Sequence, residues 1–188
     1  RIAGFAYDDC AGHARWYEPA EWLGLDDARK AALGGEGTDP AGALHLLSDQ
    51  PHDKLHSQLD HGEYCASFKR AGRAPVRLSP ADARSRGIAD GDLVRVFNVR
   101  GATLATATID DGQMPGVAKL STGAWFDPWR QTGPLVDKHG NPNAVTRDAG
   151  ASSLSQGCAA QTCLVWVEPW RGEIPAVTAF DLPARVSA

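Results

Sequence analysis

The chain has 188 residues, of which 43% are hydrophobic, so it is long enough for one well-packed domain with an appended arm and short for two. Its formal net charge of −4 at pH 7 argues against a nucleic-acid or anionic membrane partner, because such partners require clustered Lys and Arg. No stretch approaches the roughly 20 apolar residues that span a bilayer. An anionic ligand would therefore have to be held by local donors.

The sequence leaves the cellular location open. It starts at Arg1 without a signal-peptide pattern, but its first residues look like the interior of a longer chain. Four cysteines in a chain with this apolar content do not require a disulfide scaffold, and we expect free thiols in a reducing compartment. The cytoplasm is favoured, with the periplasm as the alternative for a parent protein.

Residues 1–43 are rich in Ala, Gly, Asp and Trp and are predicted to form an N-terminal arm or linker from a preceding domain. Within them, only Pro19–Leu33 has helical spacing. The stretch Gly34–Gly42 contains too much Gly and Pro for regular structure and marks a boundary. Residues 44–188 are then expected to form the body of the domain and a C-terminal tail.

From Leu44 onward, short β-like runs alternate with turn signals, which predicts a mainly β domain with short helices. Several short strands without βαβ spacing indicate a barrel. The runs are Leu44–Ser48, Val76–Leu78, Leu93–Val99, Ala102–Ile109, Val117–Thr122 and Leu164–Glu168.

One helix is predicted between the second and third of these runs. Ser79 can cap its N-terminus, Pro80 suits the first helical position, and Gly87 would end it. Asp90-Gly91 then supplies a tight turn before a strand, and Arg100-Gly101 reverses the chain into the next one. The usual phosphate loops, GxGxxG and GxxxxGKS/T, are absent from the sequence.

The segment Leu47–Leu59 (LSDQPHDKLHSQL) follows a strand and is dense in polar side chains. Ring nitrogens, hydroxyls and amides in a row can bind a ligand that has many oxygens and nitrogens. A polar surface turn is the alternative. Spacing alone does not choose between the two.

His52, His56 and His61 could suggest a zinc site, because histidines four residues apart share one helical face. Pro51 and Gly62 interrupt a helix there, however, and no Glu lies between the histidines as in HExxH. A solvated or ligand-facing His is favoured over a metal ligand.

Cys158 and Cys163 lack a second cysteine pair with zinc spacing, and we expect buried thiols at both positions. A Ser/His/Asp triad has no supporting motif either, since the Gly-x-Ser-x-Gly elbow is absent. The sequence therefore predicts no catalytic nucleophile.

Two later segments carry further candidates. Gly123–Trp129 ends a strand with aromatic residues, for which we expect core packing, with a cleft wall as the alternative. Asn143 and Gln156 lie in loops rich in Gly and Ser. Their amides suit the paired donors and acceptors on the edges of purines and pterins.

In this order, the segments resemble the C-terminal molybdopterin-dinucleotide-binding domain of the dimethyl sulfoxide reductase family of molybdenum oxidoreductases. The resemblance runs from about Leu44 to Trp170, and Ser79 stands where the family commonly has Asn, a small change at a helix cap. The motifs that carry it are Leu55–Leu59 (LHSQL), Pro80–Asp92 (PADARSRGIADGD), Asn98–Gly101 (NVRG), Pro115–Val117 (PGV), Gly123–Pro128 (GAWFDP), Asn143–Thr146 (NAVT) and Ser153–Gln156 (SLSQ). The arm motifs Tyr7–His13 and Trp16–Trp22 look most like the biotin sulfoxide reductase and trimethylamine-N-oxide reductase branch.

The resemblance implies a six-stranded double-psi β-barrel that covers bis(molybdopterin guanine dinucleotide)-molybdenum. It implies no catalytic residue and no metal ligand in this chain, because the side chain that binds molybdenum in this family comes from another domain. The residues that it implies for binding the pterin or nucleotide are Gln50, His56, Ser57, Gln58, Asn143, Gln156 and the backbone of Gly157.

We therefore expect the cofactor-binding part of an oxidoreductase that reduces S-oxides or N-oxides by oxygen-atom transfer, of the biotin sulfoxide, methionine sulfoxide or trimethylamine N-oxide type. Its partners would be the remaining domains of the parent, the oxide and an electron donor that the sequence does not identify. The chain alone is not expected to be active. Two other classes stay open: a double-psi barrel that serves as a non-catalytic interaction or adaptor module, and a zinc-binding structural protein.

Overall fold

The computed structural model describes residues 7–129, 135–158 and 163–182. Its helices are short: α1 (Asp27–Gly34), α2 (Glu63–Ala66) and α3 (Pro80–Ser85), with 3-10 turns η1 (Pro40–Gly42) and η2 (Pro142–Ala144). The strands are β1 (Leu44–Leu47), β2 (Pro75–Leu78), β3 (Leu93–Asn98), β4 (Gly101–Ile109), β5 (Val117–Leu120), β6 (Pro128–Trp129), β7 (Val136–Asp137) and β8 (Cys163–Pro169).

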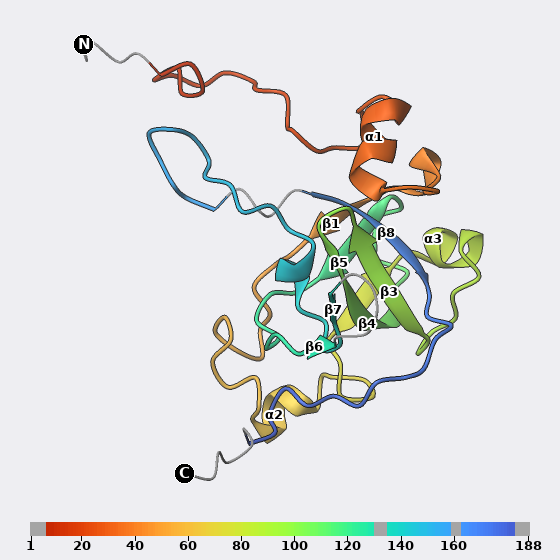
Figure 1. The fold of residues 1–188 in the computed structure, drawn as a ribbon. Coiled ribbons are helices and arrows are strands. Elements are labelled where there is room, and N and C mark those ends of the chain that lie inside the picture. Colours follow the sequence, from red (N-terminus) through yellow and green to blue (C-terminus); the bar gives the residue numbers. More distant parts are fainter. Residues whose placement is uncertain (1–6, 130–134, 159–162, 183–188) are drawn as a thin grey trace, which may run out of the picture.

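Six strands close into a barrel (Figure 1). Neighbours follow the order β2, β5, β1, β8, β3 and β4, and the pairing of β2 with β4 closes the ring. The pairs β1–β5 and β2–β4 are parallel, whereas the other pairs of the ring are antiparallel. A short β6–β7 hairpin extends the sheet from β4. The expected mainly β fold with short helices and a six-stranded double-psi barrel is confirmed.

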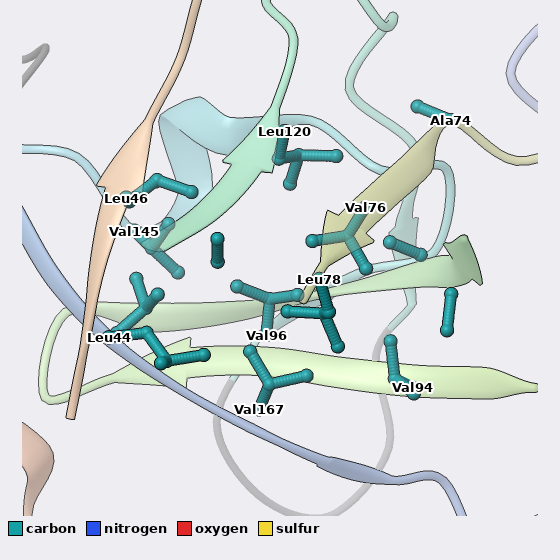
Figure 2. Close-up of a cluster of buried hydrophobic side chains, with 14 of the residues drawn as sticks. Leu44, Leu46, Ala74, Val76, Leu78, Val94, Val96, Leu120, Val145 and Val167 are labelled. Atoms are coloured by element: carbon teal, nitrogen blue, oxygen red, sulfur yellow. The ribbon is translucent and has the colours of Figure 1, made fainter. Parts of the chain in front are cut away.

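The inside of the barrel is filled by aliphatic side chains (Figure 2). Val76 and Leu78 of β2, and Val94 and Val96 of β3, have no solvent exposure, and Leu120 of β5 packs with them. Burying one such side chain contributes about 1.5–3 kcal/mol relative to leaving it exposed. The six strands of the ring correspond to the six β-like runs predicted from the sequence. Short runs with alternating apolar residues form strands because one face of each strand is buried in the core.

The predicted local signals around α3 are confirmed. The Ser79 hydroxyl accepts a hydrogen bond from the Asp82 backbone N–H at 3.0 Å, Pro80 is the first helical residue, and Gly87 has a φ of +64°. Gly91 has a φ of +90°, as the Asp90-Gly91 turn requires. The strands β3 and β4 form the predicted hairpin, with Asn98 opposite Gly101.

The residues before the barrel differ from expectation in detail. The helix α1 begins only at Asp27, because Asp26 accepts a hydrogen bond from the Arg29 N–H and caps it. The stretch Gly34–Gly42, expected to lack regular structure, contains the end of α1 and η1, where Asp39 caps the turn that Pro40 starts. Short polar caps can impose a turn on a sequence rich in Gly and Pro.

The segment before α1 is attached to the barrel by a buried carboxylate. Glu21 is 3% exposed, forms an ion pair with Arg100 at 2.6 Å, and accepts a hydrogen bond from the Leu164 N–H at 3.0 Å. Leu25 belongs to the same buried hydrophobic cluster as Leu164 and Trp166 of β8. The division of the chain at residues 43 and 44 remains a prediction.

Five short elements of the described residues were not predicted, namely α2, β6, β7 and the turns η1 and η2. Each is at most four residues long, so periodicity gives no signal for it. No helix within the described ranges is long and apolar enough to cross a membrane.

Candidate functional site

A cavity of about 540 Å³ lies where three connecting segments meet. The loop between β1 and α2 contributes His56 and Ser57, the residues after β5 contribute Thr122–Phe126, and the η2 turn contributes Asn141 and Asn143. None of these lining side chains is a Lys, Arg, Asp or Glu. The cavity is therefore lined by hydroxyl, amide and imidazole groups and by the rings of Trp125 and Phe126.

The close approach of two of these segments depends on a glycine. A Cβ on Gly123 would lie 1.9 Å from the carbonyl oxygen of His56, and Gly123 has a φ of +100°. His56 itself has a φ of +50° and Leu59 one of +66°, which is uncommon for side-chain-bearing residues. Backbone of this kind persists only where surrounding contacts hold it.

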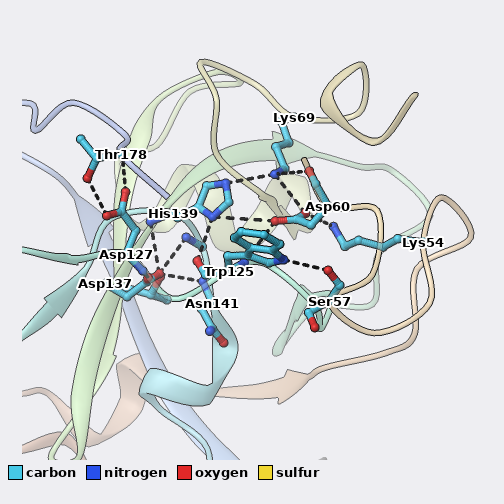
Figure 3. Close-up of polar contacts among 12 residues, drawn as sticks. Lys54, Ser57, Asp60, Lys69, Trp125, Asp127, Asp137, His139, Asn141 and Thr178 are labelled. Atoms are coloured by element: carbon cyan, nitrogen blue, oxygen red, sulfur yellow. Dashed lines mark hydrogen bonds and ion pairs between the residues drawn. The ribbon is translucent and has the colours of Figure 1, made fainter. Parts of the chain in front are cut away.

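Trp125 joins all three segments (Figure 3). Its indole N–H donates to the Ser57 carbonyl at 2.8 Å, and its backbone N–H donates to Asp60 at 3.1 Å. Its carbonyl lies 2.8 Å from Nδ1 of His139, and a carbonyl can only accept, so Nδ1 carries the proton. Phe180 packs against the indole at a centroid distance of 5.2 Å. This wall of the cavity is consequently fixed at its backbone and at its ring.

Asp60 is fully buried and is paired with two lysines. Its Oδ1 lies 2.8 Å from Nζ of Lys54 and 3.0 Å from Nζ of Lys69, and Oδ2 accepts the Trp125 N–H. Desolvation raises the pKa of Asp60, but the hydrogen bonds from Lys54, Lys69 and Trp125 outweigh it and leave that pKa below the ordinary value. Asp60 is therefore ionised at neutral pH.

His139 completes this cluster as a neutral ring. Burial lowers its pKa, so Nε2 is unprotonated and accepts from Nζ of Lys69 at 3.0 Å. Lys69 also donates to the Asp60 backbone carbonyl at 3.0 Å and lies 4.5 Å from the centre of the Phe180 ring. Burial also lowers the pKa of Lys69. All three ammonium hydrogens of Lys69 thus have partners.

Two further buried carboxylates, Asp127 and Asp137, hold the residues from β7 to η2. Asp137 accepts hydrogen bonds from the Asn141 N–H at 2.7 Å, the Gly140 N–H at 2.9 Å, the Asp127 N–H at 2.8 Å and the Thr103 hydroxyl at 2.5 Å. The Thr178 hydroxyl and N–H both donate to Asp127. Asp137 therefore fixes the turn that leads to Asn141, and Asp127 ties the residues after β8 to it.

The structure brings three of the predicted site residues together: His56, Ser57 and Asn143 all line the cavity. Within the described part of the chain, their side chains form no hydrogen bond, so these donors and acceptors are available to a ligand. Their role in cofactor binding remains a prediction.

The other predicted residues lie elsewhere. Gln50 lines a neighbouring cavity and is already engaged, since its amide donates to the Lys54 carbonyl at 2.6 Å and accepts from the His56 N–H at 3.3 Å. Gln58 is exposed at the tip of the same loop. Gln156 and Gly157 belong to residues 150–158, which extend from the barrel beside the N-terminal residues, where Ser153 donates to Asp9 at 2.6 Å (Figure 1).

Two predictions about side-chain environment were wrong. Trp125 and Phe126, expected to pack in the core, are 39% and 49% exposed and line the cavity, because the buried positions of that segment are taken by Ala124 and Asp127. Cys158, expected to be buried, is exposed because it lies on the 150–158 extension. Cys163 is buried as expected, and burial raises the pKa of its thiol to about 11.

The three histidines considered for zinc lie in different surroundings. His52 packs against Phe68, with ring centroids 4.7 Å apart, whereas His61 lies 5.7 Å from Trp125. His56 lines the cavity. The described residues contain no group of three or more His, Cys, Asp or Glu side chains that could hold a metal ion.

Sequence reasoning missed Thr122, Asn141 and the buried charges behind the cavity. Asn141 offered a signal, since Asn141-Pro142-Asn143 forms an Asx turn in which Oδ1 of Asn141 accepts the Asn143 N–H at 2.9 Å. Its Nδ2 forms no hydrogen bond within the described residues and is left for the cavity. Asp60, Lys69 and His139 offered none, because their partners are up to 70 residues away in sequence.

Comparison with known proteins gives a consistent result. The family described as "Molydopterin dinucleotide binding domain" matches residues 44–164. A biotin sulfoxide reductase of Cereibacter sphaeroides is 49% identical over 96% of this chain and 22% of its own length. A trimethylamine-N-oxide reductase of Salmonella typhi is 43% identical over 100% of this chain and 21% of its own length. The chain thus spans about a fifth of these relatives, and the resemblance drawn from the motifs is confirmed.

Among solved structures, acetylene hydratase from Pelobacter acetylenicus superposes with a TM-score of 0.61 at 17% identity. The match covers 83% of this chain and 21% of that enzyme. At this identity, the likeness supports the fold.

Proposed function

This chain belongs to the molybdopterin dinucleotide-binding domain family, and we propose that it is the cofactor-holding part of a larger molybdenum oxidoreductase that reduces S-oxides or N-oxides. The names of its relatives support this class of substrate. The observation in the structure that carries the proposal is the cavity without Lys, Arg, Asp or Glu in its lining, where the side chains of His56, Ser57 and Asn143 form no hydrogen bond with any described residue.

The residues present fit a pterin dinucleotide. A pterin edge alternates donors and acceptors, and the cavity offers a hydroxyl, an imidazole and the amides of Asn141 and Asn143. Gly123 allows the two lining segments to approach where a Cβ would collide with the His56 carbonyl. We propose bis(molybdopterin guanine dinucleotide)-molybdenum as the form of the cofactor.

In this function, the chain orients the cofactor and excludes water from it. When bound, the cofactor supplies the two-electron redox chemistry that transfers an oxygen atom. Arg100 lines an adjoining cavity of about 330 Å³ but is already paired with Glu21, and Lys54, which approaches Gly123, is paired with Asp60. We therefore propose that the other domains of the parent neutralise most of the pyrophosphate charge, and that they supply the oxide site and the contact with the electron donor.

The proposal is tested in the full-length parent by molybdenum analysis and by the fluorescence of the oxidised pterin. A variant with His56, Ser57 and Asn143 replaced by Ala should lose molybdenum and pterin while its circular dichroism is unchanged. A control with Ala at the exposed positions Glu36, Asp111 and Met114 should retain both.

A wild-type parent without molybdenum or pterin would overturn the proposal and favour an adaptor module. Full cofactor content in the triple variant would instead overturn the assignment of these three residues. Replacing Gln156 with Ala tests the predicted contact that the structure places outside the cavity.

A further inference from the structure

We propose that Asp60 is a positioning residue for the dinucleotide: from behind the cavity, it holds the loop that carries His56 and Ser57 against Trp125. Asp60 is fully buried and is not part of the cavity lining, so it acts through its neighbours. The inference rests on the proposed function, because it concerns how this cavity keeps its shape for that cofactor.

The loop between β1 and α2 has little regular structure of its own. Its internal backbone hydrogen bonds include those from Gln58 to Leu55 and from Gly62 to Leu59, and two of its residues have positive φ. Such a segment is held in one conformation by tertiary contacts rather than by local propensity. Asp60, near the end of the loop, makes three of those contacts, with Lys54, Lys69 and Trp125.

Asp60 restrains the loop from two directions. Within the loop, its carboxylate is paired with Lys54, which lies just before His56. From the segment after β5, it accepts the N–H of Trp125, whose indole in turn donates a hydrogen bond to the Ser57 carbonyl. The stretch from Lys54 to Asp60 is therefore fastened at its start, middle and end (Figure 3).

A carboxylate is required for this arrangement. Three donors from three segments, Lys54, Lys69 and Trp125, reach its two oxygens. An Asn side chain has one acceptor oxygen. Its NH₂ group takes the place of the second carboxylate oxygen and faces one of these donors. The change from Asp to Asn preserves volume but leaves at least one donor facing another donor. It also removes the carboxylate that Lys54 and Lys69 share, and leaves Lys54 with Asp53 at 3.7 Å as its remaining ion-pair partner among the described residues.

The test uses the full-length parent with two matched substitutions, Asp60→Asn and Asp82→Asn. Asp82 is also a multiply bonded, mostly buried carboxylate, paired with Arg86 at 3.2 Å and accepting the Gly116 N–H at 2.8 Å, but it lies on α3 and does not line the cavity. The measurements are the half-time of molybdenum and pterin loss after gel filtration, and hydrogen exchange of residues 48–62 and 122–127.

We expect Asp60→Asn to shorten the half-time of cofactor loss about ten-fold, in the range typical of residues that orient ligands from outside the site. It should also speed exchange in residues 48–62, whereas Asp82→Asn should change neither. If Asp60→Asn matches Asp82→Asn in both measurements while the wild type retains cofactor, the positioning role is excluded and the proposed function stands. A wild type without cofactor would overturn both.

A second variant covers the case in which Asp60→Asn does not fold. Trp125→Phe keeps both backbone hydrogen bonds but removes the indole donor to Ser57. Faster exchange of residues 55–58 together with faster cofactor loss supports positioning. Faster cofactor loss without a change in hydrogen exchange would show that the Trp125 ring acts only by direct contact with the cofactor. That result would contradict the inference.

Discussion

The inside of the barrel and the buried charges behind the cavity are equally hidden from solvent, but they are built by different means. Val76 and Leu78 have no exposure and contribute through apolar burial, which needs no particular partner. Asp60 and Asp137 have none either, but each requires several donors at fixed positions. Apolar packing therefore sets the stability of the barrel, whereas the directional contacts set the shape of the cavity.

The largest effect on the free energy of unfolding is expected from a substitution inside the barrel. Leu78→Ala should lower the free energy of unfolding by about 3 kcal/mol, because it removes a fully buried side chain and leaves a void. Urea denaturation measures this. If the two regions act independently, the cofactor retained by the folded fraction of the parent should be unchanged. A loss of cofactor from folded protein would show that apolar packing also controls the shape of the cavity.

A substitution among the buried carboxylates should lower the free energy of unfolding by somewhat less, but it should alter the cavity. Asp137→Asn would direct an NH₂ at one of the backbone donors that the carboxylate now accepts, such as that of Asp127 or Asn141. We expect a loss of about 2 kcal/mol in urea denaturation. Hydrogen exchange of residues 137–143 should rise at the same time. Unchanged exchange there would contradict the view that this carboxylate fixes the η2 turn.

Two glycines with similar φ separate backbone strain from close approach. Gly91 has a φ of +90° with nothing within 4 Å of a built Cβ, whereas the Cβ of Gly123 would strike the His56 carbonyl. Gly91→Ala should cost about 1 kcal/mol from its backbone conformation alone. Gly123→Ala should cost more and should also reduce cofactor retention. If urea denaturation gives both variants the same loss of unfolding free energy, the loop at His56 moves away from the added Cβ at no cost.

The smallest effect is expected from pH. Because burial lowers the pKa of His139 below the ordinary 6.5, the unfolded state takes up a proton below that pH before the folded state does. Its contribution to stability is complete above pH 6.5 and falls as the pH drops below it. Asp60 stays ionised in this window because its pKa lies below the ordinary 3.8. His139→Asn should therefore flatten the decline in urea midpoint between pH 7 and 5.

His45, which lies on β1, provides the internal reference for that experiment. Burial lowers its pKa in the same direction, so the wild type and the His139→Asn variant share its contribution. The difference between the two pH profiles then belongs to His139. Parallel profiles would show that His139 takes up its proton in the folded state as easily as in the unfolded state.

The barrel strands, the α3 cap and the family could be predicted from the sequence alone, because each signal lies in residues within a few positions of one another. Alternation identified β2 and β5, and Ser79 with Pro80 located the helix start. The motif LHSQL pointed to His56 and Ser57, and the amide in NAVT pointed to Asn143. These patterns involve only neighbouring residues. The folded chain therefore keeps the local structure that they predict.

Which of those residues share a cavity, and what holds them there, depends on contacts between distant parts of the chain. Ser57 meets Trp125 across 68 positions of sequence, and Lys69 meets His139 across 70. Gln156 has a side chain as suitable as that of Asn143, but its loop extends toward Asp9. Hydrogen bonds and ion pairs form between groups at contact distance, and that distance is set by how the barrel closes, not by any local pattern.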